Sequence, residues 1–133
     1  RLYGRYAGKL IHDPPFPGYG LITLCRGDLI CGTTLVEIKA NSVARKKRPF
    51  TLYDYHQLII YCALNYLAGE MYDIQKIELF NPRDGYLWQS DLKEFIFLIS
   101  NSSSSDLFNS IGSFLTAFPE TFDLGTGYEF SEF

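Results

Sequence analysis

Along the first forty positions, apolar residues occur in short runs interrupted by polar, proline and glycine positions. Runs of this length, rich in β-branched and aromatic residues, are typical of strands. The stretch 13–18, with three prolines and a glycine, interrupts them and predicts a break in secondary structure. The strands expected in this part are residues 6–11, 19–25, 29–31 and 34–39.

The last two of these strands flank Gly32 and Thr33. A two-residue connection that begins with glycine predicts a type II′ turn and therefore a tight β-hairpin. Pairing across this turn places Cys31 opposite Thr34 and, further along, Asp28 opposite Glu37.

Between positions 51 and 68 the apolar residues recur every three or four positions, which predicts an amphipathic helix. Thr51 can cap its start, Asp54 can complete a capping box, and Gly69 can end it. The residues expected to face the core are Tyr55, Leu58, Ile59, Cys62, Ala63 and Tyr66.

The second half of the chain continues with two strands, 74–80 and 86–89, joined by a turn over 81–85. Ser90 is expected to cap a second helix, whose core-facing side would carry Leu92, Phe95, Ile96 and Ile99. The order of strands and helices predicts an α/β fold with a mixed central β-sheet flanked by helices.

We expect residues 1–99 to form this α/β domain. Residues 100–133 are expected to form a Ser-rich linker and an acidic, aromatic C-terminal segment with an amphipathic piece over 107–118. Because the chain begins at Arg1 rather than Met, we expect it to be the C-terminal part of a longer protein.

The composition of the 133 residues, with 47% hydrophobic and 20% charged residues, predicts a single packed domain and excludes disorder for most of the chain. The longest nearly apolar stretch, 58–68, is much shorter than the ~20 residues of a membrane span. No membrane partner is therefore expected.

The net charge of −3 is unevenly distributed. Residues 1–99 contain all 12 basic residues and carry +2, whereas residues 100–133 carry −5. A nucleic-acid partner is therefore plausible for the first part and not for the acidic end.

The three cysteines, Cys25, Cys31 and Cys62, lie in apolar runs without the short spacing of a zinc site. They are expected to be reduced thiols of the core in a cytoplasmic protein.

The predicted hairpin brings three charged side chains close together. Directly opposed residues share one face of a sheet, so Asp28 and Glu37 are expected to lie side by side, with Lys39 two residues along on the same face. Opposed carboxylates repel unless a cation lies between them, and Mg²⁺ prefers oxygen ligands of this kind. The alternative is a surface hairpin with a Glu–Lys pair and an unrelated Asp.

Gln57 and Tyr61 are four residues apart on the predicted helix and therefore share a face, beside the core-facing side. An amide and a phenol at this place can contact a nucleotide or a phosphate. The alternative is an exposed glutamine and a tyrosine at the edge of the core.

Taken in order, Asp28, the Glu37-Ile38-Lys39 tripeptide and the pair Gln57 and Tyr61 resemble the PD-(D/E)xK nuclease superfamily. The resemblance is to the branch with a Q-xxx-Y motif, which includes RecB-type and lambda-exonuclease-type nucleases. It extends over roughly residues 19–99 and implies a restriction-endonuclease-like core.

The resemblance also implies roles. The ligands of Mg²⁺ or Mn²⁺ would be Asp28, Glu37 and the main-chain carbonyl of Ile38. Lys39 would position the attacking water or stabilise the transition state. Gln57 and Tyr61 would shape the site and hold the substrate strand, with Tyr61 among the nucleic-acid-binding residues.

The activity that the resemblance implies is metal-dependent hydrolysis of phosphodiester bonds in DNA, with RNA not excluded as a substrate. The enzyme would act as an endonuclease or an exonuclease, and its role would lie in DNA repair or in antiviral (anti-phage) defence. The four consecutive cations Arg45, Lys46, Lys47 and Arg48 can contact backbone phosphates or form a solvated loop. The alternative function is a catalytically inactive nucleic-acid-binding or protein-interaction module with the same fold, and other domains or a protein partner are expected.

One feature departs from the superfamily. Its members usually carry a helix before the first core strand, often with a further acid or histidine. Here only His12 and Asp13 are available near that place, and neither lies in a sequence typical of a helix.

Overall fold

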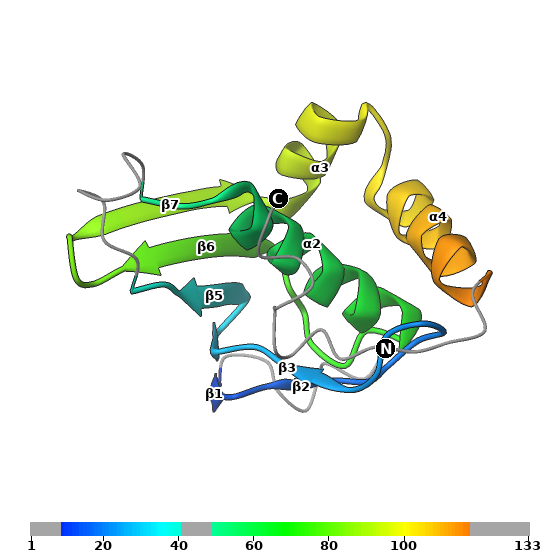
Figure 1. The fold of residues 1–133 in the computed structure, drawn as a ribbon, viewed down its shortest axis with the longest axis horizontal. Helices are drawn as coiled ribbons and strands as arrows, with labels where there is room; N and C mark the ends of the chain where they lie inside the picture. The colour runs from blue at the N-terminus through cyan, green and yellow to red at the C-terminus, as the bar shows by residue number, and fades with distance from the viewer. Residues whose placement is uncertain (1–8, 41–48, 118–133) are drawn as a thin grey trace.

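The computed structural model describes residues 9–40 and 49–117 of the chain (Figure 1). Its main sheet has five strands in the spatial order β1, β4, β5, β6, β7, and a two-stranded ribbon, β2 with β3, lies beside it. The strands are β1 (Leu10–His12), β2 (Pro15–Phe16), β3 (Cys25–Arg26), β4 (Leu29–Cys31), β5 (Thr34–Ile38), β6 (Lys76–Asn81) and β7 (Tyr86–Asp91). The helices are α2 (Leu52–Leu67), α3 (Leu92–Ser100) and α4 (Ser104–Thr116).

The sheet is mixed, as expected. β5 and β6 pair in parallel, whereas β1 with β4, β4 with β5, and β6 with β7 pair antiparallel. Parallel neighbours need a long crossover connection, and α2 lies within that connection. The predicted α/β class with a mixed central sheet is therefore confirmed.

The β4–β5 hairpin has the predicted register, with Leu29 opposite Val36 and Cys31 opposite Thr34. Gly32 adopts a φ of +62°, and a type II′ turn requires a positive φ at this first central position. The turn therefore fixes which residues of the two strands face each other.

Helix α2 begins and ends where the sequence predicts. Thr51 Oγ1 accepts a hydrogen bond from the Asp54 N–H at 3.4 Å, and Asp54 Oδ2 accepts one from the Thr51 N–H at 2.8 Å, which completes the capping box. Gly69, just beyond the helix, has a φ of +90°. The expected helix boundaries are confirmed.

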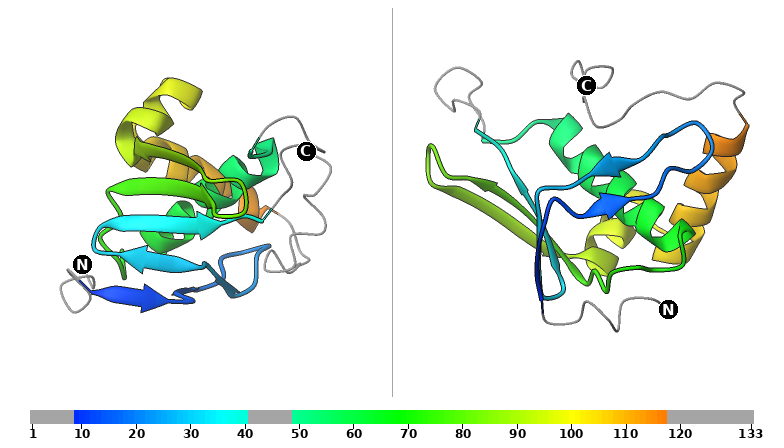
Figure 2. Two further views of the ribbon diagram at one scale, coloured as in Figure 1. Left: turned by 90° about the vertical axis from the view of Figure 1, so that its left-hand side faces the viewer. Right: turned by 90° about the horizontal axis from the view of Figure 1, so that it is seen from below.

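One face of the sheet forms the core with α2. The register places Ile30, Leu35, Ile77 and Leu79 on this face, and all four are at most 1% exposed. Leu58 and Cys62 of α2 belong to the same buried cluster. Figures 1 and 2 show α2 along this side of the sheet, with α4 against the flank of α2.

The N-terminal strands differ from the prediction. The proline-rich stretch contains strand β2, and the expected strand 19–25 is reduced to β3 and an isolated bridge between Tyr19 and Ile22. The reason is tertiary: Phe16 is fully buried and stacks on Tyr61 with ring centroids 5.0 Å apart. Burial of this ring holds the proline-rich stretch against α2 despite its poor strand propensity.

The cap of α3 is Asp91, not Ser90 as predicted. The pairing of β6 with β7 continues to Lys76 opposite Asp91, so Ser90 remains in the strand. The Asp91 side chain accepts from the Glu94 N–H at 3.0 Å. Of the expected core-facing residues of this helix, Ile99 is 52% exposed.

The expected linker over 101–105 is shorter than predicted. Asn101 ends α3 in the left-handed region, and Ser103 caps α4 by accepting from the Asp106 N–H at 3.2 Å. Phe108 and Leu115 of α4 are buried in the same cluster as the sheet and α2. The amphipathic segment thus packs as a third helix of this core.

Two of the three thiols, Cys25 and Cys62, are buried as expected. Cys31 is exposed, because it lies next to the hairpin turn on the sheet face that α2 does not cover. Among the described residues, no helix has the combination of length and apolar character that a membrane span requires.

Leu115→Ala tests whether α4 is part of the core. Leu115 is 4% exposed, so we expect a loss of about 2–5 kcal/mol in the free energy of unfolding. Leu98 on α3 is 81% exposed, and the matched control Leu98→Ala should change stability by no more than ~0.5 kcal/mol. Chemical denaturation measures both, and equal effects would contradict the packing of α4.

Candidate active site

Asp28 and Glu37 meet at the end of the β4–β5 hairpin. The Asp28 N–H donates to Glu37 Oε1 at 2.8 Å, and the Ile38 N–H donates to Asp28 Oδ2 at 2.7 Å. Each carboxylate is therefore held by a main-chain group of the opposite segment. The predicted proximity of the two acids is confirmed. Ile38 contacts the pair through its N–H, which donates to Asp28.

Glu37 is buried, and this changes its acidity. Removal from water and, second, the negative charge of Asp28 raise its pKa from 4.5 to about 8. The hydrogen bond from Asp28 and the charge of Lys39 act in the opposite direction but do not compensate. Without a cation, the charged form of Glu37 is therefore disfavoured.

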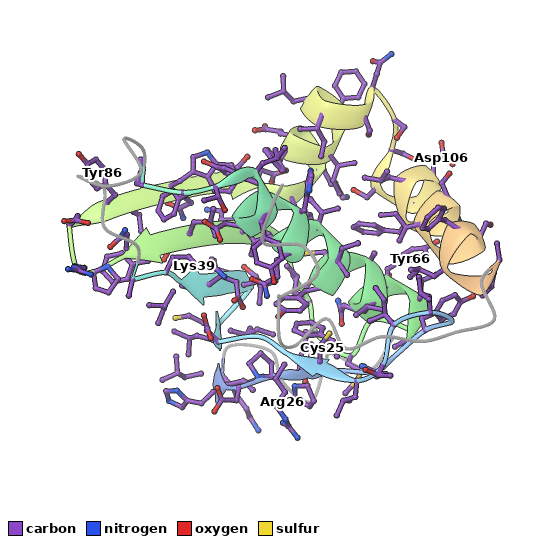
Figure 3. All side chains as sticks on the ribbon, in the orientation of Figure 1. Cys25, Arg26, Lys39, Tyr66, Tyr86 and Asp106 are labelled. Atoms are coloured by element: carbon purple, nitrogen blue, oxygen red, sulfur yellow. The ribbon has the colours of Figure 1, made fainter. Side chains whose placement is uncertain are left out.

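Lys39 follows directly after β5, where its N–H donates to Phe80 O at 2.8 Å. Its ammonium donates to Gln57 Oε1 at 2.6 Å and lies 4.0 Å from Glu37 Oε2. Figure 3 shows Lys39 beside β5. The side chain is 16% exposed, so the ammonium is partly removed from water.

Gln57 connects Lys39 to the core. Because an ammonium can only donate hydrogen bonds, the amide oxygen of Gln57 faces Lys39 and the amide nitrogen faces the other way. Gln57 Nε2 donates to Tyr61 Oη at 2.9 Å and to Tyr53 Oη at 3.3 Å. The hydrogen-bonding capacity of this amide is thus used within the site.

Tyr61 ends the chain of contacts by donating from Oη to Arg26 O at 3.1 Å. It is 1% exposed and Gln57 is 7% exposed, so both lie in the core and not beside it, and the alternative of an exposed glutamine is wrong. Burial, then the negative charge of Glu37, raises the pKa of Tyr61, so its phenol stays protonated and can donate.

The structure thus brings five of the residues singled out from the sequence into one connected cluster. These residues are Asp28, Glu37, Lys39, Gln57 and Tyr61. The basic residues Arg45, Lys46, Lys47 and Arg48 lie outside the described residues. His12 faces away from the cluster because it pairs with Leu29, on the opposite face of the sheet from Asp28 and Glu37.

Sequence reasoning missed Asp54 as a member of this cluster. Asp54 is 3% exposed, and its Oδ1 lies 3.7 Å from Lys39 Nζ. The sequence does indicate this position for Asp54, because Asp54, Gln57 and Tyr61 are spaced by three and four residues and therefore share one helix face. Capping the helix is a sufficient reason for an aspartate at this position, so there was no separate reason in the sequence to expect its contact with Lys39.

The donors suit a hard cation. Mg²⁺ is bound through oxygen, often by one or two carboxylates, with water completing the coordination. Asp28 and Glu37 supply two carboxylates whose mutual repulsion a divalent cation would relieve. Within residues 9–40 and 49–117, no group of three or more His, Cys, Asp or Glu side chains could hold a metal ion.

Comparison of the chain with protein-family models, curated proteins and solved structures gives no match.

The pH dependence of stability tests the burial of Glu37. Its pKa is about 8 in the folded protein and near 4.5 when exposed, so between these values unfolding releases a proton. The contribution of Glu37 to the free energy of unfolding is therefore complete below pH 4.5 and falls as the pH rises toward 8, by at most about 1.4 kcal/mol per pH unit.

Glu37→Gln removes this titration and keeps an acceptor for the Asp28 N–H. In EDTA, the variant should match the parent chain near pH 5 and exceed its unfolding free energy at pH 8, as measured by urea titration. Parallel pH profiles of the two proteins would show that Glu37 ionises normally.

Proposed function

We propose that this chain is a metal-dependent nuclease domain of the PD-(D/E)xK type, in the Q-xxx-Y branch, which hydrolyses phosphodiester bonds of DNA. The observation that carries the proposal is the connected cluster of Asp28, Glu37, Lys39, Gln57 and Tyr61. Chance occurrences of these motifs would not be expected to converge, because their residues come from three segments: the loop before β4, the end of β5 and helix α2.

The arrangement of the elements also supports the proposal. The acid before β4, the E-x-K segment at β5 and the Q-xxx-Y segment on α2 follow the order that the resemblance implies. The mixed sheet, with α2 in the crossover from β5 to β6, is compatible with a restriction-endonuclease-like core.

In this proposal Asp28 and Glu37 hold the cation, together with the main-chain carbonyl of Ile38. A bound Mg²⁺ or Mn²⁺ supplies a Lewis acid for phosphate oxygens and lowers the pKa of water. Lys39 presents its ammonium toward the phosphate, where it stabilises developing negative charge. Gln57 and Tyr61 fix the position of that ammonium through their hydrogen bonds.

The sequence between Lys39 and Thr51 contains Arg45, Lys46, Lys47 and Arg48. In the proposal these cations neutralise backbone phosphates of the substrate. Their short separation from Lys39 along the chain favours contact with the same strand that the site cleaves.

A second candidate function is an inactive nucleic-acid-binding or interaction module with the same fold. Two observations favour it. No helix precedes β4 within residues 9–40, so a further acid from such a helix is missing there. The described residues also offer only the Asp28 and Glu37 pair rather than three clustered ligand side chains.

Cleavage by the purified chain separates the two candidates. With Mg²⁺ or Mn²⁺, the parent chain should degrade labelled linear DNA, and EDTA should stop the reaction. Asp28→Asn should abolish cleavage, because it removes a ligand charge while keeping an acceptor for the Ile38 N–H. Circular DNA and RNA in parallel reactions define the substrate. Absence of metal-dependent cleavage, or full activity of Asp28→Asn, would contradict the nuclease proposal.

Lys39→Met tests the proposed role of the ammonium. Loss of a group that stabilises developing charge should lower the cleavage rate by about 100-fold or more. The affinity for Mn²⁺, measured by calorimetry, should be retained, because Lys39 is not a ligand. A parallel loss of Mn²⁺ affinity would show that Lys39 supports the metal site and not the reaction.

A further inference from the structure

Asp54 has a carboxylate oxygen that the capping box does not use. Its Oδ2 accepts the hydrogen bond from the Thr51 N–H, whereas its Oδ1 lies 3.7 Å from Lys39 Nζ. The Asp54 side chain is 5% exposed. A buried carboxylate is unfavourable unless it is paired, so its second oxygen needs the nearby ammonium.

Lys39 therefore stands between two carboxylates. Its ammonium is 3.7 Å from Asp54 and 4.0 Å from Glu37, and its short hydrogen bond, 2.6 Å, goes to Gln57. The Tyr53 ring lies 5.8 Å away, measured from the ammonium to the ring centroid. Asp54, Gln57 and Tyr53 all belong to α2, so the helix attracts the ammonium away from the hairpin.

The balance between the two carboxylates matters for the proposed metal site. An ammonium in contact with Glu37 and a divalent cation bound to Glu37 compete for the same oxygens. With the charge of Asp54 removed, Glu37 would be the remaining carboxylate near Lys39 among the described residues. The ammonium would then move toward the hairpin.

We propose that Asp54 is a positioning residue: its charge holds Lys39 on α2 and leaves the Asp28 and Glu37 carboxylates free for a divalent cation. This inference rests on the proposed function, since it concerns the same site. It gives the first turn of α2 a second role besides starting the helix.

Asp54→Asn tests the inference, because it removes the charge but keeps an oxygen for the cap. We expect the dissociation constant for Mn²⁺, measured by calorimetry on the full chain, to increase roughly threefold to tenfold, as is usual for coupled charged groups. Thr51→Ala is the matched control. It weakens the capping box from the other side, lowers the melting temperature, and should leave Mn²⁺ affinity unchanged.

The Lys39→Met background shows whether the effect passes through the ammonium. There, Asp54→Asn should lose most of its effect on Mn²⁺ affinity, because no ammonium remains to move. An equal effect in both backgrounds would overturn the inference, since Asp54 would then act through the fold or through its own charge.

Two further outcomes distinguish this inference from the function on which it rests. If the parent chain binds Mn²⁺ and Asp54→Asn binds it equally well, the positioning role of Asp54 is wrong and the metal site stands. If the parent chain itself does not bind Mn²⁺, the metal site fails and the inference fails with it.

Discussion

The rest of the candidate site depends on the burial of the Glu37 carboxylate beside Asp28. Water is largely excluded from Glu37, and a second acid lies against it, so the charged form is disfavoured and its pKa is raised to about 8. The main-chain N–H groups of Asp28 and Ile38 fix both acids despite this cost. A cation between the two acids would relieve this cost, and the proposed function rests on that expectation.

Helix α2 connects this site to the stability of the whole domain. Its buried side contributes Leu58 and Cys62 to the core, while its first turns supply the polar groups around Lys39. Tyr61 belongs to both, because its ring stacks on Phe16 and its hydroxyl donates to Arg26 O. The polar groups around Lys39 are therefore carried by a well-packed helix, which suits groups that must be held in fixed positions.

The sequence predicted those parts of the fold that depend on local rules. The two-residue turn at Gly32 set the hairpin register, and with it the meeting of Asp28 and Glu37. The capping box at Thr51 and the spacing of Gln57 and Tyr61 set the start of α2 and one shared helix face. Each of these follows from backbone geometry within a few residues, so no knowledge of the remaining chain was needed.

The tertiary structure decided what depends on contacts between distant segments. Strand β2 forms in a proline-rich stretch because the ring of Phe16 is buried against Tyr61. Helix α4 packs in the core through Phe108 and Leu115. Gln57 proved to be buried because Lys39 and two tyrosine hydroxyls satisfy its amide. Asp54, which sequence analysis identifies as a cap, also faces Lys39.

Sequence alone determined which groups lie on one face of each element. Only packing determined which faces meet, because burial and charge pairing depend on segments far apart in the chain.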